Sequence, residues 1–389
     1  MQTAAHYGAS IQILEEIFNG SPAERALLSW SRNSRFAGSK DRSAIRDIVF
    51  DCLRCKESYG AALDKTPRGI ALARAFHFDE LSQIDGEGYS PSLPSDDELS
   101  KLNDQSEFLN CAQEFDFPEF LEFELKNQYG NKLPKIMSAM RERAPVDLRV
   151  NVLKTNKKEA IDLLARDLIF VDELPLVGTA LRINLNPRKL SQSRAYNYGY
   201  VELQDLSSQF VAKMAGAKPN MSVLDYCAGG GGKTLALGME MRDEGRLDAW
   251  DINAGRMKEI PARAARAGVN VRVLKQHPTD QYDLVFVDAP CSGSGAWRRT
   301  PDAKWNLTEA RVQELCQLQR DVLAQASRHV RKGGRLVYAT CSILERENQL
   351  QTAQFLANNA NFTLTEDRAL TPIEAGDGFY GAVFDKANA

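Results

Sequence analysis

From about Asp205 to the end of the chain, short apolar segments alternate with longer amphipathic ones, and this alternation restricts the fold more than any other feature. Strands are expected at residues 222–227, 246–252, 271–275, 282–289 and 334–342. Helices are expected at residues 233–241, 254–268, 308–330 and 346–359. Alternating strands and helices form a sheet with helices on both faces. The sequence therefore predicts a doubly wound α/β domain, in which ligands bind at the carboxyl ends of the strands.

The segments before residue 205 differ from this pattern, and a chain of 389 residues is longer than one domain normally is. In residues 1–80 apolar residues recur about every 3.6 positions, which predicts a small helical domain. Residues 81–117 are rich in Gly, Pro, Ser and Asp and predict an acidic linker. Residues 118–204 predict two helices and a small α+β insert, followed by the α/β domain over residues 205–389.

The formal net charge of -3 conceals an uneven distribution of charge. Residues 85–125 contain twelve acidic residues and one lysine, so the remainder of the chain has a net charge of +8. Two regions are basic: residues 31–56 hold seven basic and three acidic residues, and residues 296–335 hold nine and four. These regions favour an anionic polymer as partner, although solvated helix faces explain either region alone equally well.

The seven cysteines are an odd number spread over a long chain, which predicts reduced thiols and no disulfide framework. Cys52 and Cys55 form a CxxC in a helix-like segment without a second Cys or His pair nearby, so we expect two buried helix cysteines and no metal site. No run of about 18 apolar residues is present, and the N-terminus lacks the pattern of a signal peptide. We therefore expect a cytoplasmic monomer with neither a membrane nor a metal as partner.

The segment VLDYCAGGGGKTLALG, residues 223–238, consists of an apolar strand, four glycines and a helix. Glycines allow close approach of the backbone to a ligand, and a helix N-terminus favours anionic groups. Cys227 stands where a Walker A motif needs its first glycine, and GxGxxG is absent, so neither nucleotide fingerprint is present. Asp251 follows the next strand, where an acid typically holds ribose hydroxyls, with a helix N-cap as the alternative. Together these features predict an adenosyl ligand.

Cys291 and Cys341 each follow an apolar strand, in DLVFVDAPC and GRLVYATC. Both positions are carboxyl ends of strands, on the same side of the sheet as the glycine loop. We therefore expect both thiols to face one cleft. Helix N-termini and nearby Lys233, Arg298 and Arg299 would lower the pKa of a thiol and favour nucleophilic chemistry.

These motifs resemble those of the RNA (cytosine-5) methyltransferases that use S-adenosyl-L-methionine, and within them the bacterial 16S ribosomal RNA methyltransferase B (Fmu/Sun) type. The resemblance rests on DYCAGGGGKT, DAPCSGSGAWRRTPDAKW, LVYATCSILERENQ and DGFYGAVF, and it spans about residues 118–389. The helical N-terminal part resembles, more loosely, the domain related to the transcription factor NusB. The resemblance implies a Rossmann-like methyltransferase domain, a small α+β RNA-binding insert, S-adenosyl-L-methionine as cofactor and RNA as partner.

The resemblance also implies roles for individual side chains. Cys341 would add to carbon 6 of cytosine, which makes carbon 5 able to accept a methyl group. Cys291 would assist release of the product, Asp288 would hydrogen-bond the cytosine edge, and Lys233 would lie near base and cofactor. The implied cofactor contacts are Cys227, Ala228, Gly229, Gly231, Lys233, Asp251, Arg256 and Asp288.

The RNA contacts that the resemblance implies are Arg298, Arg299, Lys304, Trp305, Arg149 and Asn151. Core packing is an equally good interpretation of Trp305. Two positions depart from the family pattern. Gly230 stands where the family usually has proline, which predicts a more flexible loop. Gln276 or His277 stands where an Asp near the adenine amine is usual, and we assign His277 no role.

Three interpretations compete. An RNA cytosine-5 methyltransferase explains both cysteines, the acid and the basic motif, with transfer RNA as an alternative to 16S ribosomal RNA. A P-loop nucleotide hydrolase explains only the glycine-lysine segment. A noncatalytic ribosome-assembly factor on the same fold explains the altered glycine loop, but it leaves the two strand-end cysteines without a reason.

Overall fold

A computed structural model describes residues 1–104 and 109–388 of the chain. The chain divides into two compact units, and neither is continuous in sequence. The first unit comprises Met1–Arg143 and Trp297–Thr308, and the second comprises Ala144–Ala296 and Glu309–Ala389. A short segment that follows the predicted Cys291 loop therefore belongs to the first unit.

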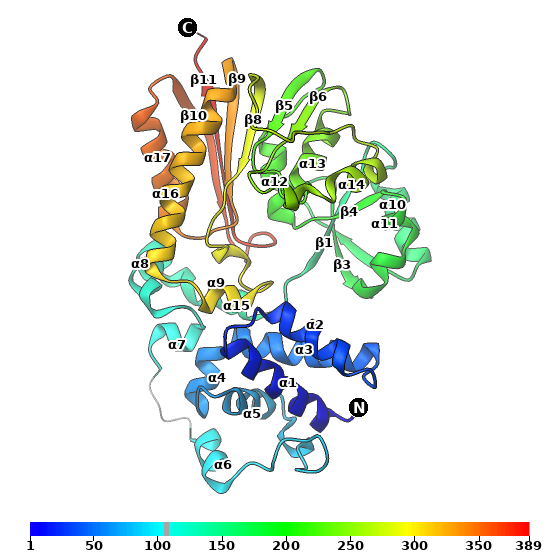
Figure 1. Cartoon of the computed structure of the whole chain (residues 1–389), viewed down its shortest axis with the longest axis vertical. Helices are drawn as coiled ribbons and strands as arrows, with labels where there is room; N and C mark the ends of the chain where they lie inside the picture. Colours follow the sequence, from blue (N-terminus) through cyan, green and yellow to red (C-terminus); the bar gives the residue numbers. More distant parts are fainter. Residues whose placement is uncertain (105–108, 389) are drawn as a thin grey trace. The chain divides into compact units, whose positions relative to one another are not determined.

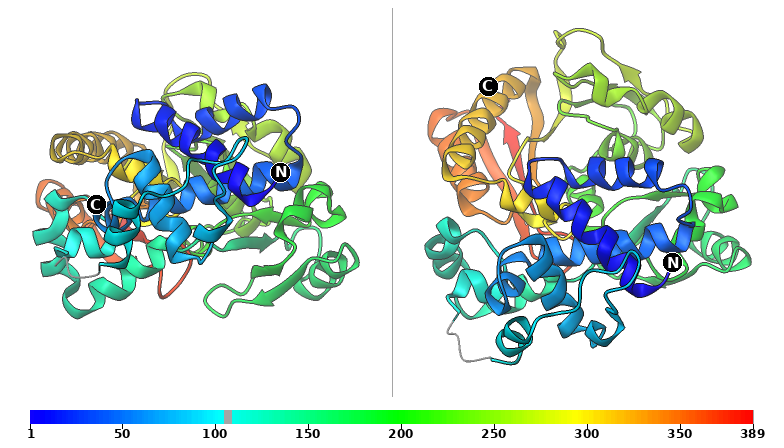
Figure 2. Two further views of the ribbon diagram at one scale, coloured as in Figure 1. Left: turned by 90° about the horizontal axis from the view of Figure 1, so that it is seen from below. Right: turned by 60° about the horizontal axis from the view of Figure 1, so that its bottom comes forward.

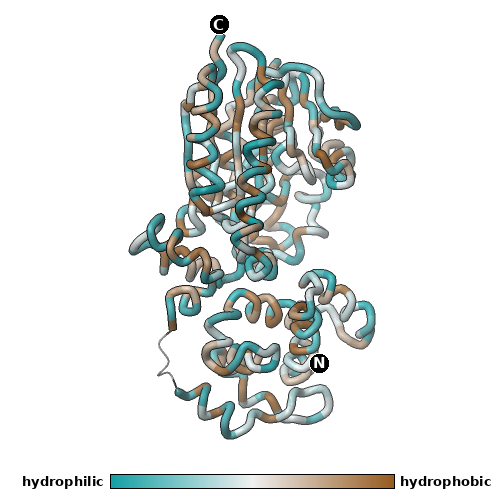
Figure 3. Tube along the Cα trace, turned by 60° about the vertical axis from the view of Figure 1, so that its left-hand side comes forward, coloured by the Kyte–Doolittle hydropathy of each residue, from teal (hydrophilic) through white to brown (hydrophobic). Residues whose placement is uncertain are grey.

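The first unit is helical (Figure 2). Its helices are α1 (Thr3–Phe18), α2 (Ala23–Asn33), α3 (Ser39–Arg54), α4 (Lys56–Ala62), α5 (Pro67–His77), α6 (Asp96–Asn103), α7 (Cys111–Phe115), α8 (Glu122–Tyr129), α9 (Leu133–Arg141) and α15 (Pro301–Trp305). Apolar side chains of α1, α2, α3 and α5 form one buried core, with Ile13, Val49 and Leu72 among them. Figure 3 shows hydrophobic residues, coloured brown, at intervals along these helices. The helices predicted within residues 1–80 are confirmed.

The CxxC cysteines lie in this helical core. Cys52 is 1% exposed and Cys55 is 6% exposed. Burial raises the pKa of both thiols, so both stay protonated at neutral pH. The prediction of two buried helix cysteines is confirmed.

The acidic segment 81–117 has more structure than the predicted linker. It contains a 3-10 turn, α6 and α7, and its Ile84 and Leu102 are buried in the core of the helical unit. Residues 105–108 of the predicted linker lie outside the described residues. Helices α8 and α9 were expected together with the α+β insert, but the helical unit continues to Arg143 and includes them.

The second unit is built on a seven-stranded sheet with the order β10-β11-β9-β8-β5-β6-β7 (Figure 1). Its strands are β5 (Met221–Asp225), β6 (Gly245–Ala249), β7 (Arg272–Val273), β8 (Tyr282–Asp288), β9 (Val330–Thr340), β10 (Phe362–Leu370) and β11 (Phe379–Lys386). The strands from β5 to β9 pair in parallel, whereas β10 and β11 are antiparallel and extend the sheet beyond β9. The carboxyl ends of β5, β6, β8 and β9 therefore meet at one edge.

Helices cover both faces of this sheet (Figure 1). Helices α12 (Leu206–Met214), α13 (Gly232–Glu240) and α14 (Ile260–Ala267) lie on one face, and α16 (Glu309–Ala326) and α17 (Gln349–Asn358) on the other. Successive side chains of β8 alternate between the two cores: Leu284 and Phe286 pack on the first face, Val285 and Val287 on the second. A strand buried on both faces reads as a continuous apolar run. The doubly wound Rossmann-like fold is confirmed.

Three details of this unit differ from the prediction. Strand β7 has only two residues, Arg272–Val273, and is shorter than the predicted strand 271–275. The predicted helix 254–268 is divided into a 3-10 turn, Ala254–Met257, and α14, which has its proline in the first turn. Strands β10 and β11 were not predicted as strands.

A small antiparallel sheet precedes the α/β sheet in the same unit. It has the order β2-β3-β1-β4, formed by β1 (Val146–Val150), β2 (Phe170–Glu173), β3 (Ala180–Leu185) and β4 (Val201–Leu203). Helix α10 (Lys157–Arg166) and the short α11 (Arg194–Asn197) pack on it. The predicted small α+β insert is confirmed as a fold.

Among the described residues, no helix has the length and apolar character needed to cross a membrane. Within the same residues, no three His, Cys, Asp or Glu side chains gather as a possible set of metal ligands.

Candidate cofactor and catalytic site

The glycine loop joins the end of β5 to the start of α13. Gly229 and Gly231 have φ angles of +51° and +82°, in the left-handed region that favours glycine. A Cβ atom at Gly231 would lie 2.8 Å from Cγ1 of Ile260, so a larger residue would also collide with α14. The amide of Gly231 donates to the carbonyl of Ala228 at 2.8 Å and closes the turn. The two glycines are thus required by the shape of the loop.

Asp251 connects the end of β6 to this loop. Its Oδ2 accepts a hydrogen bond from the amide of Gly229 at 3.0 Å and pairs with Nη1 of Arg256 at 3.2 Å. Its Oδ1 accepts from the amide of Asn253 at 2.9 Å. The residue that caps the following turn is Asn253, whose side chain accepts from Gly255 N. The N-cap interpretation of Asp251 is therefore wrong.

A cavity of about 150 Å³ lies beside the loop. It is lined by Gln204, Ser208, Asp225, Cys227, Ala228, Gly229, Gly230, Gly232, Lys233, Arg256 and Asp288. Six of the eight predicted cofactor residues are in this set. The other two, Gly231 and Asp251, hydrogen-bond to loop residues that line the cavity. The fold thus brings the predicted cofactor residues together.

Asp225 is a cavity residue that the sequence analysis did not identify. It is the last residue of β5 and is fully buried. Its Oδ2 accepts a hydrogen bond from the hydroxyl of Thr234 at 2.6 Å, whereas Oδ1 has no hydrogen-bond partner among the described residues. Burial raises the pKa of Asp225 to about 7, although the bond from Thr234 opposes the shift. An acid at the end of a buried strand, directly before the glycine loop, is the sequence signal for it.

Lys233 and Asp288 form an ion pair at the carboxyl ends of β5 and β8. Nζ of Lys233 lies 2.7 Å from Oδ2 of Asp288 and 4.8 Å from the centroid of the Phe379 ring. Burial lowers the pKa of Lys233, but the carboxylate of Asp288 and the nearby Cys341 more than offset this, so the net shift is upward. A charged lysine therefore faces the thiol region and the cavity.

The two strand-end cysteines are neighbours. Sγ of Cys291 lies 3.4 Å from Sγ of Cys341, a hydrogen-bond distance for sulfur. Both thiols are free and partly buried. The hydrogen bond with Cys341, together with burial, raises the pKa of Cys291 well above its usual value. Cys291 consequently keeps its proton at neutral pH, and the two thiols lie side by side, as expected if both face one cleft.

Glu347 links the loops that carry these cysteines, and the sequence analysis did not identify it. This carboxylate is completely buried. Oε1 accepts from the amide of Ser292 at 2.8 Å and from Nε2 of Gln319 at 3.0 Å. Oε2 accepts from the hydroxyls of Ser292 and Ser342, each at 2.5 Å. Because each serine directly follows a cysteine, one buried carboxylate fixes the separation of the two thiols.

Comparison with known proteins places this site in a family. The family model for 16S rRNA methyltransferase RsmB/F matches residues 213–382, and a model for the RsmF/B-like ferredoxin-like domain matches residues 117–188. Over 338 residues the chain is 31% identical to ribosomal RNA small subunit methyltransferase B of Erwinia tasmaniensis, covering 83% of this chain and 76% of that protein. The chain belongs to the RsmB/F methyltransferase family. The enzyme of the same name from Photorhabdus laumondii is 31% identical over 302 residues and covers 72% of this chain.

Solved structures agree on the fold. The structure of PH0851 has a TM-score of 0.78 and 23% identity, with 99% of each chain covered. A methyltransferase homologue from Pyrococcus horikoshii has a TM-score of 0.64 and 24% identity, covering 71% of this chain and 97% of its own. At these identities the likeness concerns the fold alone.

As an RsmB/F family member, the chain is an S-adenosyl-L-methionine-dependent RNA methyltransferase. The residues of the cavity fit this cofactor. Asp251 stands at the end of the second strand, where ribose hydroxyls bind in this type of sheet. The unpartnered Oδ1 of the buried Asp225 fits a positively charged amino group.

After β7, where the resemblance led us to expect an Asp near the adenine amine, the chain has Gln276 and His277. His277, which follows β7, is hydrogen-bonded instead to the hydroxyl of Tyr226 through Nε2 at 2.9 Å. Its ring lies 4.8 Å from that of Trp250 and 5.3 Å from that of His329. His277 is therefore held in an aromatic cluster that connects the ends of β5, β6 and β7.

Two of the predicted RNA contacts belong to the region of the small sheet and are buried in this structure. Arg149 is 4% exposed and Asn151 is 6% exposed. Nη1 of Arg149 donates to the carbonyl of Gly232 at 3.1 Å. The side-chain amide of Asn151 donates to the carbonyls of Gly199 and Ala267 at 2.9 and 2.7 Å. Both side chains tie the small sheet to the α/β sheet, so the LRVNVLKT segment has a structural role here.

The segment after Cys291 also requires correction. Lys304 is 1% exposed, and Nζ donates to the carbonyls of Arg54 and Asp116 at 2.8 and 2.6 Å. Burial lowers the pKa of Lys304 to about 8. Nε1 of Trp305 donates to the carbonyl of Leu53 at 2.6 Å, which agrees with core packing. These residues hold α15 in the helical unit, so they do not contact RNA from an exposed position.

Arg298 and Arg299 of this segment differ in solvent exposure. Arg298 is 5% exposed and its carbonyl accepts a hydrogen bond from Nε of Arg54 at 2.9 Å, so this predicted RNA contact is also buried in the structure. Arg299 is half-buried. That Arg299 contacts RNA stays a prediction.

Proposed function

We propose that this chain transfers a methyl group from S-adenosyl-L-methionine to carbon 5 of a cytosine in 16S ribosomal RNA, through a covalent bond between Cys341 and the base. The observation that carries the proposal is the pair of thiols 3.4 Å apart, beside the ion pair of Lys233 and Asp288. The names of the relatives supply ribosomal RNA as the substrate class. S-adenosyl-L-methionine, when bound, supplies the methyl group as an electrophile.

Carbon 5 of cytosine is a weak nucleophile, so the base must be activated by addition of a thiolate to carbon 6. Cys341 suits this step because it lies at the same edge of the sheet as Lys233 and Cys291. Lys233 is a nearby cation, and Sγ of Cys291 lies 3.4 Å from Sγ of Cys341. The addition places negative charge on the pyrimidine ring. The ammonium of Lys233, which pairs with Asp288, would stabilise this charge.

Cys291 suits the second half of the reaction. Its largest source of a raised pKa is the hydrogen bond with Cys341. Once Cys341 has formed the bond to carbon 6, this cause of the raised pKa of Cys291 is removed, and the pKa falls. Cys291 then gives its own proton to water, and its thiolate accepts the proton from carbon 5, while the electron pair of that C–H bond re-forms the C5–C6 double bond and Cys341 leaves as a thiolate.

We assign cofactor binding to the loop residues Cys227, Ala228, Gly229 and Gly231 and to the side chains that line or adjoin the cavity, and we assign Arg299 to the RNA. Asp251 would accept from the ribose hydroxyls, and Arg256 holds Asp251 in position. Asp225 would bind the amino group of the cofactor through its unpartnered Oδ1. These assignments use only residues of the second unit, apart from Arg299.

The decisive experiment compares the wild type with Cys341→Ala and Cys291→Ala, using S-adenosyl-L-methionine with a labelled methyl group and 16S ribosomal RNA. Cys341→Ala is expected to reduce methyl transfer to background. Cys291→Ala is expected to accumulate a covalent protein–RNA adduct that survives denaturing electrophoresis, because addition proceeds and release does not. Methyl transfer at the normal rate by Cys341→Ala would refute the mechanism.

A second experiment separates 16S ribosomal RNA from transfer RNA as the substrate. Mapping of 5-methylcytosine in both RNAs, with and without the gene, identifies which RNA is methylated. Methylation of transfer RNA alone would replace 16S ribosomal RNA as the substrate. Retained binding of S-adenosyl-L-methionine without transfer to either RNA would favour the noncatalytic assembly factor.

A further inference from the structure

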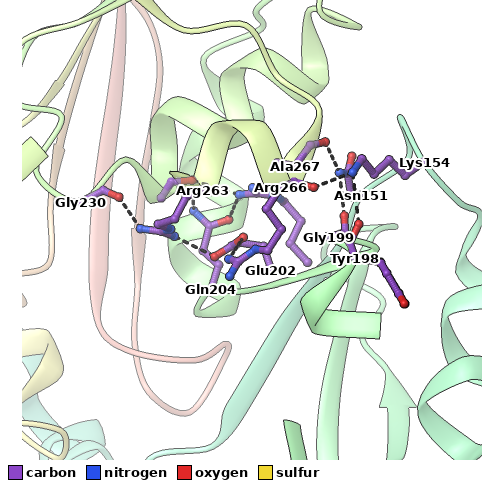
Figure 4. Close-up of polar contacts among 12 residues, drawn as sticks. Asn151, Lys154, Tyr198, Gly199, Glu202, Gln204, Gly230, Arg263, Arg266 and Ala267 are labelled. Atoms are coloured by element: carbon purple, nitrogen blue, oxygen red, sulfur yellow. Dashed lines mark hydrogen bonds and ion pairs between the residues drawn. The ribbon is translucent and has the colours of Figure 1, made fainter. Parts of the chain in front are cut away.

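The glycine loop is held by hydrogen bonds from side chains to which no step of the proposed reaction is assigned. Nη1 of Arg263, on α14, donates to the carbonyl of Gly230. Nη1 of Arg149 and Nε2 of Gln204 donate to the carbonyl of Gly232 at 3.1 and 3.2 Å. Figure 4 shows Arg263 between Gly230 and the small sheet. Two carbonyls of the loop thus have defined directions.

Glu202 of β4 orients Arg263. Nη2 of Arg263 lies 2.9 Å from Oε1 of Glu202, and Nη2 of the neighbouring Arg266 lies 2.7 Å from Oε2 (Figure 4). Glu202 is 4% exposed, so its charge is little screened by solvent. Arg149 completes the set by donating to Oε1 of Gln204. We call Arg149, Glu202, Gln204 and Arg263 the loop-holding network.

The direction of a carbonyl matters because the peptide unit is planar and trans. Fixing the carbonyl of Gly230 fixes the amide N–H of Gly231, and fixing the carbonyl of Gly232 fixes the amide of Lys233. Four consecutive glycines otherwise have more backbone freedom than any other sequence, and ordering them costs conformational entropy. The network opposes this freedom before a ligand arrives, which lowers the ordering cost that binding must meet.

We propose that Arg263, oriented by Glu202, is a positioning residue for the cofactor: it holds the Gly230 peptide of the glycine loop in the conformation that binds S-adenosyl-L-methionine. Gly230 was expected to leave the loop more flexible, and Arg263 supplies the missing restraint. Arg149 holds Gly232 in the same way, from a strand that we first assigned to RNA. The proposal rests on cofactor binding in this loop, which is part of the proposed function.

The test measures binding of S-adenosyl-L-homocysteine by calorimetry and methyl transfer at saturating cofactor. Arg263→Gln removes the bond to the Gly230 carbonyl and is expected to raise the Kd for the cofactor about tenfold, as expected for loss of a charged hydrogen bond. At saturating cofactor, kcat and the KM for RNA should remain within about twofold of the wild type, because the network contacts no reacting atom. This split between KM for the cofactor and kcat is what a positioning role predicts.

Arg266→Gln is the matched control. Arg266 lies on the same helix, pairs with the same Glu202 and has a similar exposure, 21% against 24% for Arg263, but it donates to no carbonyl of the glycine loop. It should leave the cofactor Kd within about twofold of the wild type. Equal weakening by both variants, or no weakening by Arg263→Gln, would overturn the proposal and leave an ordinary structural ion-pair network.

Thermal unfolding of both variants shows whether they fold alike. A wild-type protein that binds no S-adenosyl-L-homocysteine refutes cofactor binding itself, whereas a wild-type protein that binds it as tightly as Arg263→Gln refutes only the positioning role. The two failures are therefore distinguishable.

Discussion

The buried carboxylate of Asp225 has one oxygen engaged by Thr234 and one without a hydrogen-bond partner in the described part of the chain. Leaving a buried polar atom without a partner costs about 1–3 kcal/mol. Burial also raises the pKa of this carboxyl to about 7, so its charge changes near neutral pH. A ligand with a positively charged group would satisfy the oxygen and favour the ionised form.

Cofactor affinity should therefore depend on pH through Asp225. Only the ionised carboxylate attracts the amino group, and with a pKa of about 7 the group is mostly protonated at pH 6 and mostly ionised at pH 8. The Kd for S-adenosyl-L-homocysteine is expected to be about tenfold higher at pH 6 than at pH 8. Asp225→Asn should bind weakly at both pH values and lose this dependence. Calorimetry at the two pH values tests it, and a constant Kd for the wild type would contradict the assignment.

At the residue scale, the sequence was sufficient to place a polar or thiol side chain where that residue closely follows a predicted strand. Cys291, Cys341 and Asp251 were placed at one end of the sheet because strand ends converge there. Arg149 shows the limit of the method. Its sequence context does not reveal that the side chain is buried beneath the glycine loop, since that contact joins residues 83 positions apart.

At the scale of elements, two loops carry the thiols of Cys291 and Cys341, and Glu347 joins these loops. It binds Ser292 and Ser342, which follow Cys291 and Cys341. The separation of two thiols is thus determined by a carboxylate from a third element, the 3-10 turn Glu345–Glu347. Small displacements of reacting groups lower rates strongly.

Glu347→Gln should separate catalysis from binding. An amide has one acceptor oxygen and cannot accept all four hydrogen bonds, so the two loops should move apart. We expect kcat to fall roughly a hundredfold, with the cofactor Kd within about threefold of the wild type because the cavity is lined by other residues. Glu345→Gln, an exposed residue of the same turn, is the matched control and should leave kcat unchanged. An equal loss of cofactor affinity and kcat in Glu347→Gln would indicate general destabilisation instead.

Most of the elements that the sequence predicted have buried, periodic apolar residues, although the buried strand β11 was missed as well. Strand β8 is apolar on both faces and was found with nearly the correct bounds. Strand β10 was missed because it is an edge strand: most of Phe362–Leu370 is exposed and carries charged residues, as edge strands commonly do. Its pairing with β11 depends on the tertiary structure and cannot be inferred from the periodicity of residues along the chain.

At the scale of the whole molecule, the chain leaves the second unit after Ala296, contributes one segment to the helical unit, and returns at Glu309. Residues 297–308 follow Cys291 in sequence but belong to the helical unit, where Lys304 donates to two carbonyls and Trp297 is 1% exposed. The sequence suggested an RNA-binding function because this segment is basic and aromatic. Its charge is used for folding instead, since a buried ammonium is stable only when its hydrogens are satisfied.

A fragment that begins at residue 144 separates the roles of the two units. Lys304 and Trp305 donate hydrogen bonds to the backbone carbonyls of Leu53, Arg54 and Asp116. A fragment without Met1–Arg143 lacks these three acceptors. Hydrogen exchange should then show full loss of protection in residues 297–308, while β5, β8 and β9 remain protected. The fragment should still bind S-adenosyl-L-homocysteine, because every residue lining the cavity belongs to the second unit. It should lose methyl transfer, since the Cys291 loop leads directly into the released segment. Retained protection of residues 297–308 in the fragment would show that this segment folds without the helical unit, contrary to the contacts described above.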